Sequence, residues 1–151
     1  MIKSKAQFKS LRERVGLSQE AIAKALGNTV MTVKRWENPR YQQPPEDAWG
    51  FLLTALDQHK RIVDDALRAV EKTIKGHGGR KPDHVDLLYY RTQQEYDLYG
   101  RDPGSYMIVN ARTREIAVRL EQLGVEARFH YPEEDEQLFT QLANTRGLEE
   151  E

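Results

Sequence analysis

The spacing of apolar residues and glycines near the start of the chain constrains the fold more than any other feature. Apolar residues recur three and four positions apart from Phe8 to Val15, which predicts an amphipathic helix that ends at Gly16. Ser18 is a good N-cap for a second short helix, which ends at Gly27. The chain therefore begins with short helices joined by glycine turns.

A third short helix completes a helix-turn-helix pattern. Thr29 can cap this helix, and Val33 and Trp36 point inward as its apolar anchors. The pattern also needs a small residue where its helices cross and a turn residue that accepts a left-handed backbone. Ala23 and Gly27 occupy those two positions. We therefore expect an all-helical N-terminal domain.

A long apolar stripe follows, after prolines and acids suited to a helix start. Side chains recur at spacings of four and three from residue 49 to residue 74, all apolar except Lys60: Trp49, Leu53, Leu56, Lys60, Val63, Leu67, Val70 and Ile74. The spacing fits one helix between Glu46 and Lys75 as well as it fits two helices with a bend near residues 57–60. Either arrangement extends the first domain to residue 75.

Every periodic pattern breaks at residues 76–82, which read Gly-His-Gly-Gly-Arg-Lys-Pro. These residues are the best linker in the chain, so we place a domain boundary there. The expected organisation is a helix-turn-helix domain with a long helical extension at 1–75, a linker at 76–82, a small domain at 83–132 and an acidic tail at 133–151.

Two strands are expected to frame the second domain. Residues 85–90 are typical of a largely buried strand. Residues 125–131 alternate between apolar and polar side chains, which predicts a strand with one buried face.

Two helices are expected between these strands. Thr92 and Glu95 form a capping box for a helix that ends at Gly100. Asp102 and the proline after it supply the cap and first turn of a second helix, which runs to Gly124. The expected fold class is therefore α+β, with an all-helical domain followed by a small strand-helix-helix-strand domain.

The charge of the chain is unevenly distributed. Residues 1–40 carry nine Lys or Arg and three acids, a net charge of +6, whereas residues 132–151 carry seven acids and one Arg, a net charge of −6. A compact basic surface gains affinity for phosphates by releasing counterions. The charge alone fits a polyanion partner at the basic end or two solvated surfaces equally well.

The composition excludes several kinds of chemistry. The chain has no Cys, which excludes disulfides, thiolate nucleophiles, Cys zinc sites and iron-sulfur clusters. Its four His show no metal-ligand spacing, and spacing suggests no nucleophile with its base. We therefore expect no metal, no cofactor and no enzymatic activity. The sequence shows neither a membrane-spanning run nor a secretory leader, so the expected location is the cytoplasm.

The helix-turn-helix segment resembles the Cro and lambda-repressor class of bacterial and phage regulators, often called the XRE family. The resemblance rests on Leu-Ser-Gln-Glu-Ala-Ile-Ala-Lys-Ala-Leu-Gly at 17–27 and Val-Lys-Arg-Trp-Glu at 33–37, and it extends over roughly residues 6–56. It implies that Thr29 caps a recognition helix in the major groove of double-stranded DNA. The residues that it places against the groove are Val30, Met31, Lys34 and Arg35.

The chemistry of these side chains suits that role. Arg35 can pair with the two acceptors of guanine, and Lys34 can reach guanine or a phosphate. Apolar contact with thymine methyl groups suits Val30, Met31 and the methyl group of Thr32.

Two further residues are expected to hold phosphates. Gln19 would do so together with the N-terminal amides of its helix, and Arg40 would do so just past the recognition helix. One residue departs from the family, which commonly has Gly where this chain has Pro39. Proline cannot take the left-handed conformation that glycine permits, so the chain is expected to leave the recognition helix differently.

The layout of the whole chain resembles the anti-CRISPR-associated phage repressors and related bacterial regulators. The resemblance implies a homodimer that binds an inverted repeat in the promoter of its own operon. We expect the C-terminal domain to join the subunits, because two strands alone cannot make a stable sheet in water. Five tyrosines of that domain favour a core or dimer interface over a base-stacking platform: Tyr89, Tyr90, Tyr96, Tyr99 and Tyr106.

Other partners stay open at this stage. An antitoxin-type regulator would bind DNA with its N-terminal half and a partner protein with its C-terminal half. RNA is a further candidate partner, because phosphate contacts do not distinguish the two polymers.

Overall fold

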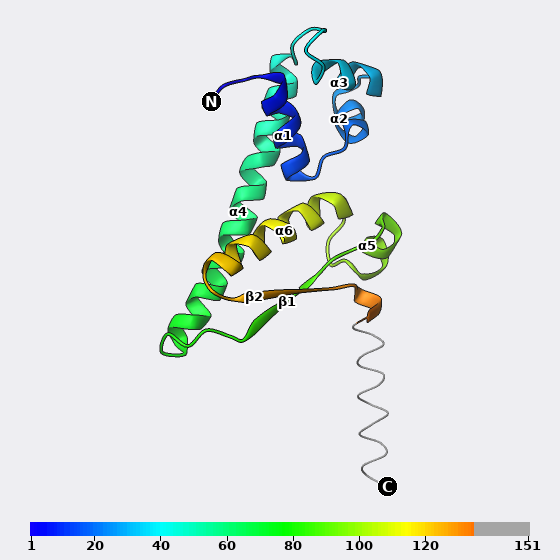
Figure 1. The fold of residues 1–151 in the computed structure, drawn as a ribbon. Helices are drawn as coiled ribbons and strands as arrows, with labels where there is room; N and C mark the ends of the chain where they lie inside the picture. The colour runs from blue at the N-terminus through cyan, green and yellow to red at the C-terminus, as the bar shows by residue number, and fades with distance from the viewer. Residues whose placement is uncertain (135–151) are drawn as a thin grey trace.

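The computed structural model of the chain describes residues 1–134 (Figure 1). Most of the acidic tail expected at 133–151 lies outside the described residues. The elements run in the order α1 (Lys5–Val15), α2 (Gln19–Leu26), α3 (Val30–Trp36), α4 (Glu46–Gly76), β1 (His84–Leu88), α5 (Gln93–Tyr99), α6 (Tyr106–Gln122) and β2 (Glu126–His130).

Local capping interactions define the three short helices as the sequence predicts. The hydroxyl groups of Ser18 and Thr29 accept hydrogen bonds from backbone N–H groups three residues later, at 3.0 and 3.2 Å. Gly16 and Gly27 end α1 and α2 with φ values of +81° and +69°, in the left-handed region. The predicted starts of α2 and α3 and the predicted ends of α1 and α2 are confirmed.

α4 is one continuous helix of 31 residues, which decides between the two arrangements that the sequence left open. Its buried stripe differs from the expected one at two positions. Leu52 and His59 lie on the buried side, whereas Lys60 is exposed and Leu53 is only partly buried. The buried stripe includes His59, which a pattern of apolar residues does not contain.

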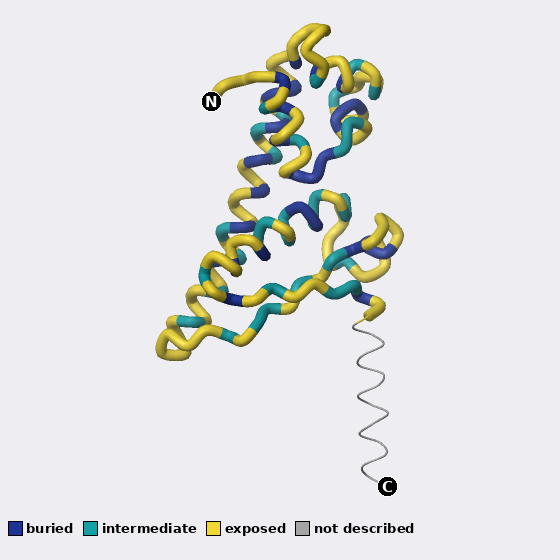
Figure 2. Tube along the Cα trace, in the orientation of Figure 1, coloured by how far each residue is buried: buried dark blue, intermediate teal, exposed yellow. Residues whose placement is uncertain are grey.

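Two hydrophobic cores share α4 (Figure 2). The first half of α4 closes the core of α1, α2 and α3, in which Phe8 meets Trp36 and Trp49 edge to face. The second half of α4 packs on α6, where Val63 and Leu67 contact the core around Leu120.

The C-terminal unit follows the predicted order of strand, helix, helix and strand. β1 and β2 pair in parallel, with Val85 opposite Ala127 and Leu87 opposite Phe129. Figure 1 shows α6 crossing α4 on one side of these strands. Within residues 1–134 no element covers the opposite side of the sheet, so β1 is half-buried and not largely buried as expected.

Two further expectations for this unit are wrong. Phe129 of the second strand was expected on a buried face but is 46% exposed, and its ring rests edge to face on Tyr89. α6 begins at Tyr106 and not at Asp102, because the loop before it is held by α5. The Gln93 side chain accepts a hydrogen bond from the backbone N–H of Tyr106 at 3.1 Å, in place of the capping hydrogen bond expected from the Asp102 side chain.

Candidate nucleic-acid interface

The buried anchors of α3 determine which of its side chains face outward. Val33 is fully buried and Trp36 is 3% exposed, so the opposite side of the helix points to solvent. Met31, Lys34 and Arg35 lie on that exposed side, with 55% of Met31 accessible. The recognition helix predicted from the sequence therefore presents a mixed apolar and basic surface.

Thr29, Val30 and Thr32 occupy the N-terminal end of this helix. Thr29 is exposed, and its hydroxyl oxygen lies 3.0 Å from that of Thr32. Val30 is partly buried and packs against the N-terminal core. The methyl groups of Val30 and Thr32 are thus less accessible than the side chain of Met31.

Gln19 lies at the start of α2 but is already engaged with a carboxylate. Its side-chain amide donates to Glu37 at 3.0 Å, and Arg12 donates to the same carboxylate through Nε and Nη2 at 2.6 and 2.9 Å. Glu37 follows the last residue of α3, so this network ties α1, α2 and α3 together. Among the described residues, the other amide N–H group of Gln19 has no hydrogen-bond partner.

The end of α3 is held by a buried lysine that the sequence analysis did not single out. The ammonium group of Lys5 donates to the carbonyl oxygens of Arg35 and Trp36 at 3.2 and 3.0 Å, and also to that of Gln42. Desolvation by burial lowers the pKa of Lys5. Lys5, Phe8 and the other buried positions of α1 share one helical spacing, which is the signal that could have identified it.

Pro39 fits the turn that leaves α3, and no left-handed residue is needed there. The Tyr41 N–H donates to the Asn38 carbonyl at 3.2 Å, and the Arg40 N–H donates to the Asn38 side chain at 3.0 Å. Proline and asparagine therefore occupy the positions that a β-turn favours. The turn leaves the Arg40 side chain exposed beside the C-terminal end of α3.

An exposed tyrosine adds to this surface. The guanidinium carbon of Arg35 lies 5.3 Å from the ring centroid of Tyr41, which is 49% exposed. Such stacking restrains the arginine while leaving the edge of its guanidinium group accessible. Tyr41 stands in the turn beyond the helix, where helical periodicity gives no signal.

The basic surface is smaller than the charge count implies. Lys5 and Arg12 are used inside the fold, so two of the nine cations at residues 1–40 do not reach the surface as free charges. Within residues 1–134 four exposed cations of this unit have no carboxylate at ion-pair distance: Lys24, Lys34, Arg35 and Arg40. They lie on or beside α2 and α3.

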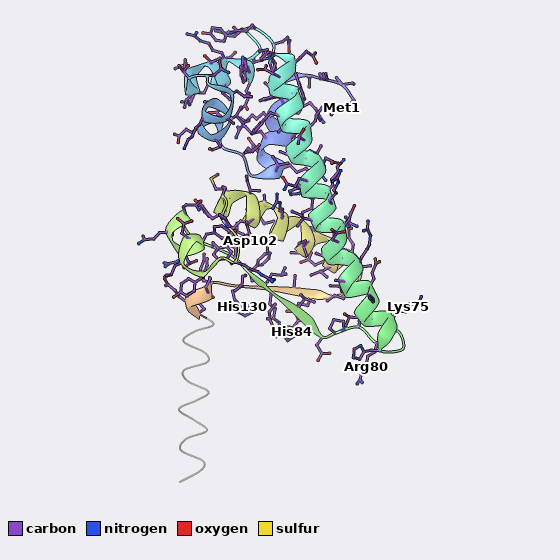
Figure 3. All side chains as sticks on the ribbon, turned by 180° about the vertical axis from the view of Figure 1, so that it is seen from behind. Met1, Lys75, Arg80, His84, Asp102 and His130 are labelled. Carbon is purple, nitrogen blue, oxygen red and sulfur yellow. The ribbon has the colours of Figure 1, made fainter. Side chains whose placement is uncertain are left out.

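Other basic residues lie far from this surface. Figure 3 shows Lys75 and Arg80 at the end of α4 that is remote from Met1. At 1.5 Å per residue, the 31 residues of α4 separate its two ends by about 46 Å. A single turn of duplex bound at α3 would therefore not also reach Lys75 and Arg80.

Comparison with known protein families supports this geometry. A family model described as a helix-turn-helix domain matches residues 6–69. No curated protein matches the chain. Among the described helices none is long and apolar enough to cross a membrane. The fold and the family match together indicate a DNA-binding regulator of transcription.

Proposed function

We propose that the chain is a homodimeric, sequence-specific repressor that binds double-stranded DNA at an inverted repeat in the promoter of its own operon. The observation that carries the proposal is the outward face of α3, where Met31, Lys34 and Arg35 project from a helix fixed by Val33 and Trp36. The proposal follows the resemblance to Cro-like regulators and to anti-CRISPR-associated repressors, and it assigns the chain no enzymatic role.

In this proposal the exposed residues divide between bases and phosphates. Arg35 reads guanine through its two acceptors, Lys34 reads guanine or a phosphate, and Met31 contacts thymine methyl groups. Gln19 and Arg40 hold phosphates on either side of the groove, which fixes the register of α3 without reading sequence.

The open sheet of the C-terminal unit supports the dimer. Within residues 1–134, β1 and β2 pair only with each other, so each strand has one free edge. A two-stranded sheet is marginally stable in water, and free edges pair readily with another strand. A second copy would enlarge the sheet and bury Phe129 and Leu88, which are 46% and 44% exposed.

Selection of the full chain on a random duplex library tests the proposal. A two-fold symmetric sequence should be enriched, with half-sites about one helical turn apart or a multiple of it. Sedimentation of the free chain should give a dimer. A monomer that enriches a single asymmetric site would contradict the inverted-repeat proposal, and equal affinity for an RNA duplex of the same sequence would contradict DNA specificity.

A further inference from the structure

A cavity of about 310 Å³ lies where the end of α1 meets β1 and α6. Its walls include Arg12, Gly16 and Leu17 from the N-terminal unit and Tyr89, Tyr106 and Arg114 from the C-terminal unit. This volume is within the range of small-molecule sites. The cavity therefore adjoins both units of the chain.

The polar groups of the cavity favour an anion. Arg114 donates from Nη1 to the Tyr89 hydroxyl at 2.8 Å, and residues 1–134 place no carboxylate at ion-pair distance from its guanidinium group. Within the described part of the chain, four of its five N–H donors have no partner, and they form the planar fork that pairs with a carboxylate. Among residues 1–134, Glu13 is the one acid on the wall, and its Oε1 lies 3.9 Å from both Lys9 Nζ and Arg12 Nη2.

The rest of the wall favours an aromatic ring. Tyr89 and Tyr106 line the cavity, together with the apolar residues Leu17 and Met107. Offset or edge contacts with aromatic rings stabilise a flat ligand beyond the burial of its area. We propose that this cavity binds a small aromatic carboxylate, with the carboxylate on Arg114 and the ring against the tyrosines.

The position of the cavity couples its occupant to α3. Gly16 touches the first turn of α6 so closely that a Cβ atom there would collide with the carbonyl oxygen of Met107. Arg12 belongs to the cavity wall and also holds Glu37 at the end of α3 and the carbonyl oxygen of Leu17. A carboxylate bound to Arg114 brings a negative charge into the cavity that Arg12 also lines. This charge competes with Glu37 for the Arg12 guanidinium group, so occupancy weakens DNA binding. This coupling rests on the proposed function, whereas binding to the cavity does not.

Titration of the full chain with indole-3-acetate, followed by amide NMR, tests the binding. Saturable shifts should appear at Gly16, Leu17 and Tyr89, with a Kd of about 10 mM or tighter. The uncharged indole-3-acetamide should bind about tenfold more weakly, because it lacks the charge-assisted hydrogen bonds. Shifts that do not saturate, that lie elsewhere or that are equal for the two compounds would overturn the proposal.

Two variants and a matched control separate recognition from folding. Arg114→Gln should weaken indole-3-acetate binding about tenfold, and Tyr89→Phe, which removes only the hydroxyl that orients Arg114, should weaken it less. Arg119→Gln changes an exposed arginine of the same helix, which pairs with Asp64, and should bind like the original chain. Equal loss in the Arg114 and Arg119 variants would overturn the role of Arg114.

Titration of the selected DNA site with and without saturating indole-3-acetate tests the coupling. The ligand should weaken DNA binding about fivefold or more, and Arg114→Gln should abolish that effect at the same ligand concentration. Unchanged DNA affinity with an occupied cavity would overturn the coupling. Absence of any specific DNA binding would instead contradict the proposed function, while the NMR titration would still report on the cavity.

Discussion

The two hydrophobic cores differ in how completely the described residues enclose them. The N-terminal core contains twelve buried apolar residues, from Phe8 to Leu56, whereas the core around Leu120 contains four, two of them supplied by α4. The first unit is closed mainly by its own helices, with Ile108 of α6 packed against it, and the second leaves one side of its sheet uncovered. The N-terminal unit therefore has the more complete core, whereas the C-terminal unit leaves a sheet face open to further contacts.

Replacing one phenylalanine in each unit by alanine should give the largest difference in the free energy of unfolding. Phe8 is fully buried between two tryptophans, so Phe8→Ala should lower the free energy of unfolding by about 3–5 kcal/mol. Phe129 is 46% exposed, so Phe129→Ala should cost less than about 1 kcal/mol in the isolated subunit. Urea unfolding at several protein concentrations measures both.

The dependence of the unfolding midpoint on protein concentration further distinguishes the two variants. If Phe129 lies in the homodimer, Phe129→Ala should shift the unfolding midpoint more at high protein concentration, where dimers predominate, and should raise the dimer dissociation constant. Similar losses for the two variants at low concentration would show that the C-terminal core is as closed as the N-terminal one.

The same difference explains what could be predicted from the sequence. Ser18, Gly27 and Thr29 act on the backbone within a few residues of themselves, so their roles were readable without tertiary structure. The start of α6 could not be predicted in this way, because the acceptor for the Tyr106 N–H is the side chain of Gln93, thirteen residues earlier. The exposure of Phe129 also depends on how far α6 covers the sheet, which a two-residue alternation cannot reveal.

Removing the C-terminal unit should separate folding from tight DNA binding. Residues 1–75 contain all twelve buried residues of the N-terminal core, so the fragment should fold. It lacks Ile108, which packs against that core, and Val63 and Leu67 lose their partners on α6. It should bind the inverted repeat about 10² to 10⁴ times more weakly than the full chain, because the second half-site contact is no longer intramolecular. Fluorescence anisotropy with the full duplex measures the loss.

A half-site duplex is the control for this fragment. The fragment and the full chain should bind one half-site with similar affinity, since α3 is intact in both. A fragment that sediments as a dimer and retains full affinity would move the dimer interface from the C-terminal unit to the helical stripe of α4.

The exposed basic surface on α2 and α3 was only partly predictable. Exposed groups such as Lys34 and Arg35 follow from helical periodicity once Val33 and Trp36 are known to point inward. Lys5 and Arg12 look like members of the basic surface, but backbone carbonyls and a carboxylate far along the chain engage them. Such pairings depend on how helices pack, and composition cannot identify them.

Two arginine variants should distinguish base reading from phosphate binding within the N-terminal unit. Arg35→Ala should remove the preference for the selected site over a scrambled duplex, a loss of about 1–3 kcal/mol of discrimination. Arg40→Ala should weaken binding to both duplexes by a similar factor and should reduce the salt dependence of binding. Competition titrations at two salt concentrations measure both effects. An unchanged preference in Arg35→Ala would remove this residue from the base-reading set.

The smallest expected effect is a pH dependence at the contact between the two units. Glu115 of α6 lies between Arg14 of α1, at 2.6 Å, and His59 of α4, which is 1% exposed. Partial burial alone would raise the pKa of Glu115, but hydrogen bonds from Arg14 and His59 and the charges of both groups outweigh it, so the pKa is lowered below 4.5. A carboxyl group whose pKa is lower in the folded state stabilises the fold above its ordinary pKa and loses that contribution as the pH falls through the lowered value.

Unfolding free energies measured from pH 6 down to about pH 3 should therefore fall more steeply for the original chain than for Glu115→Gln. Glu121→Gln, an exposed change on the same helix, should leave the slope unchanged. Identical slopes for the original chain and Glu115→Gln would show that Glu115 makes no pH-dependent contribution to stability at the contact between the two units.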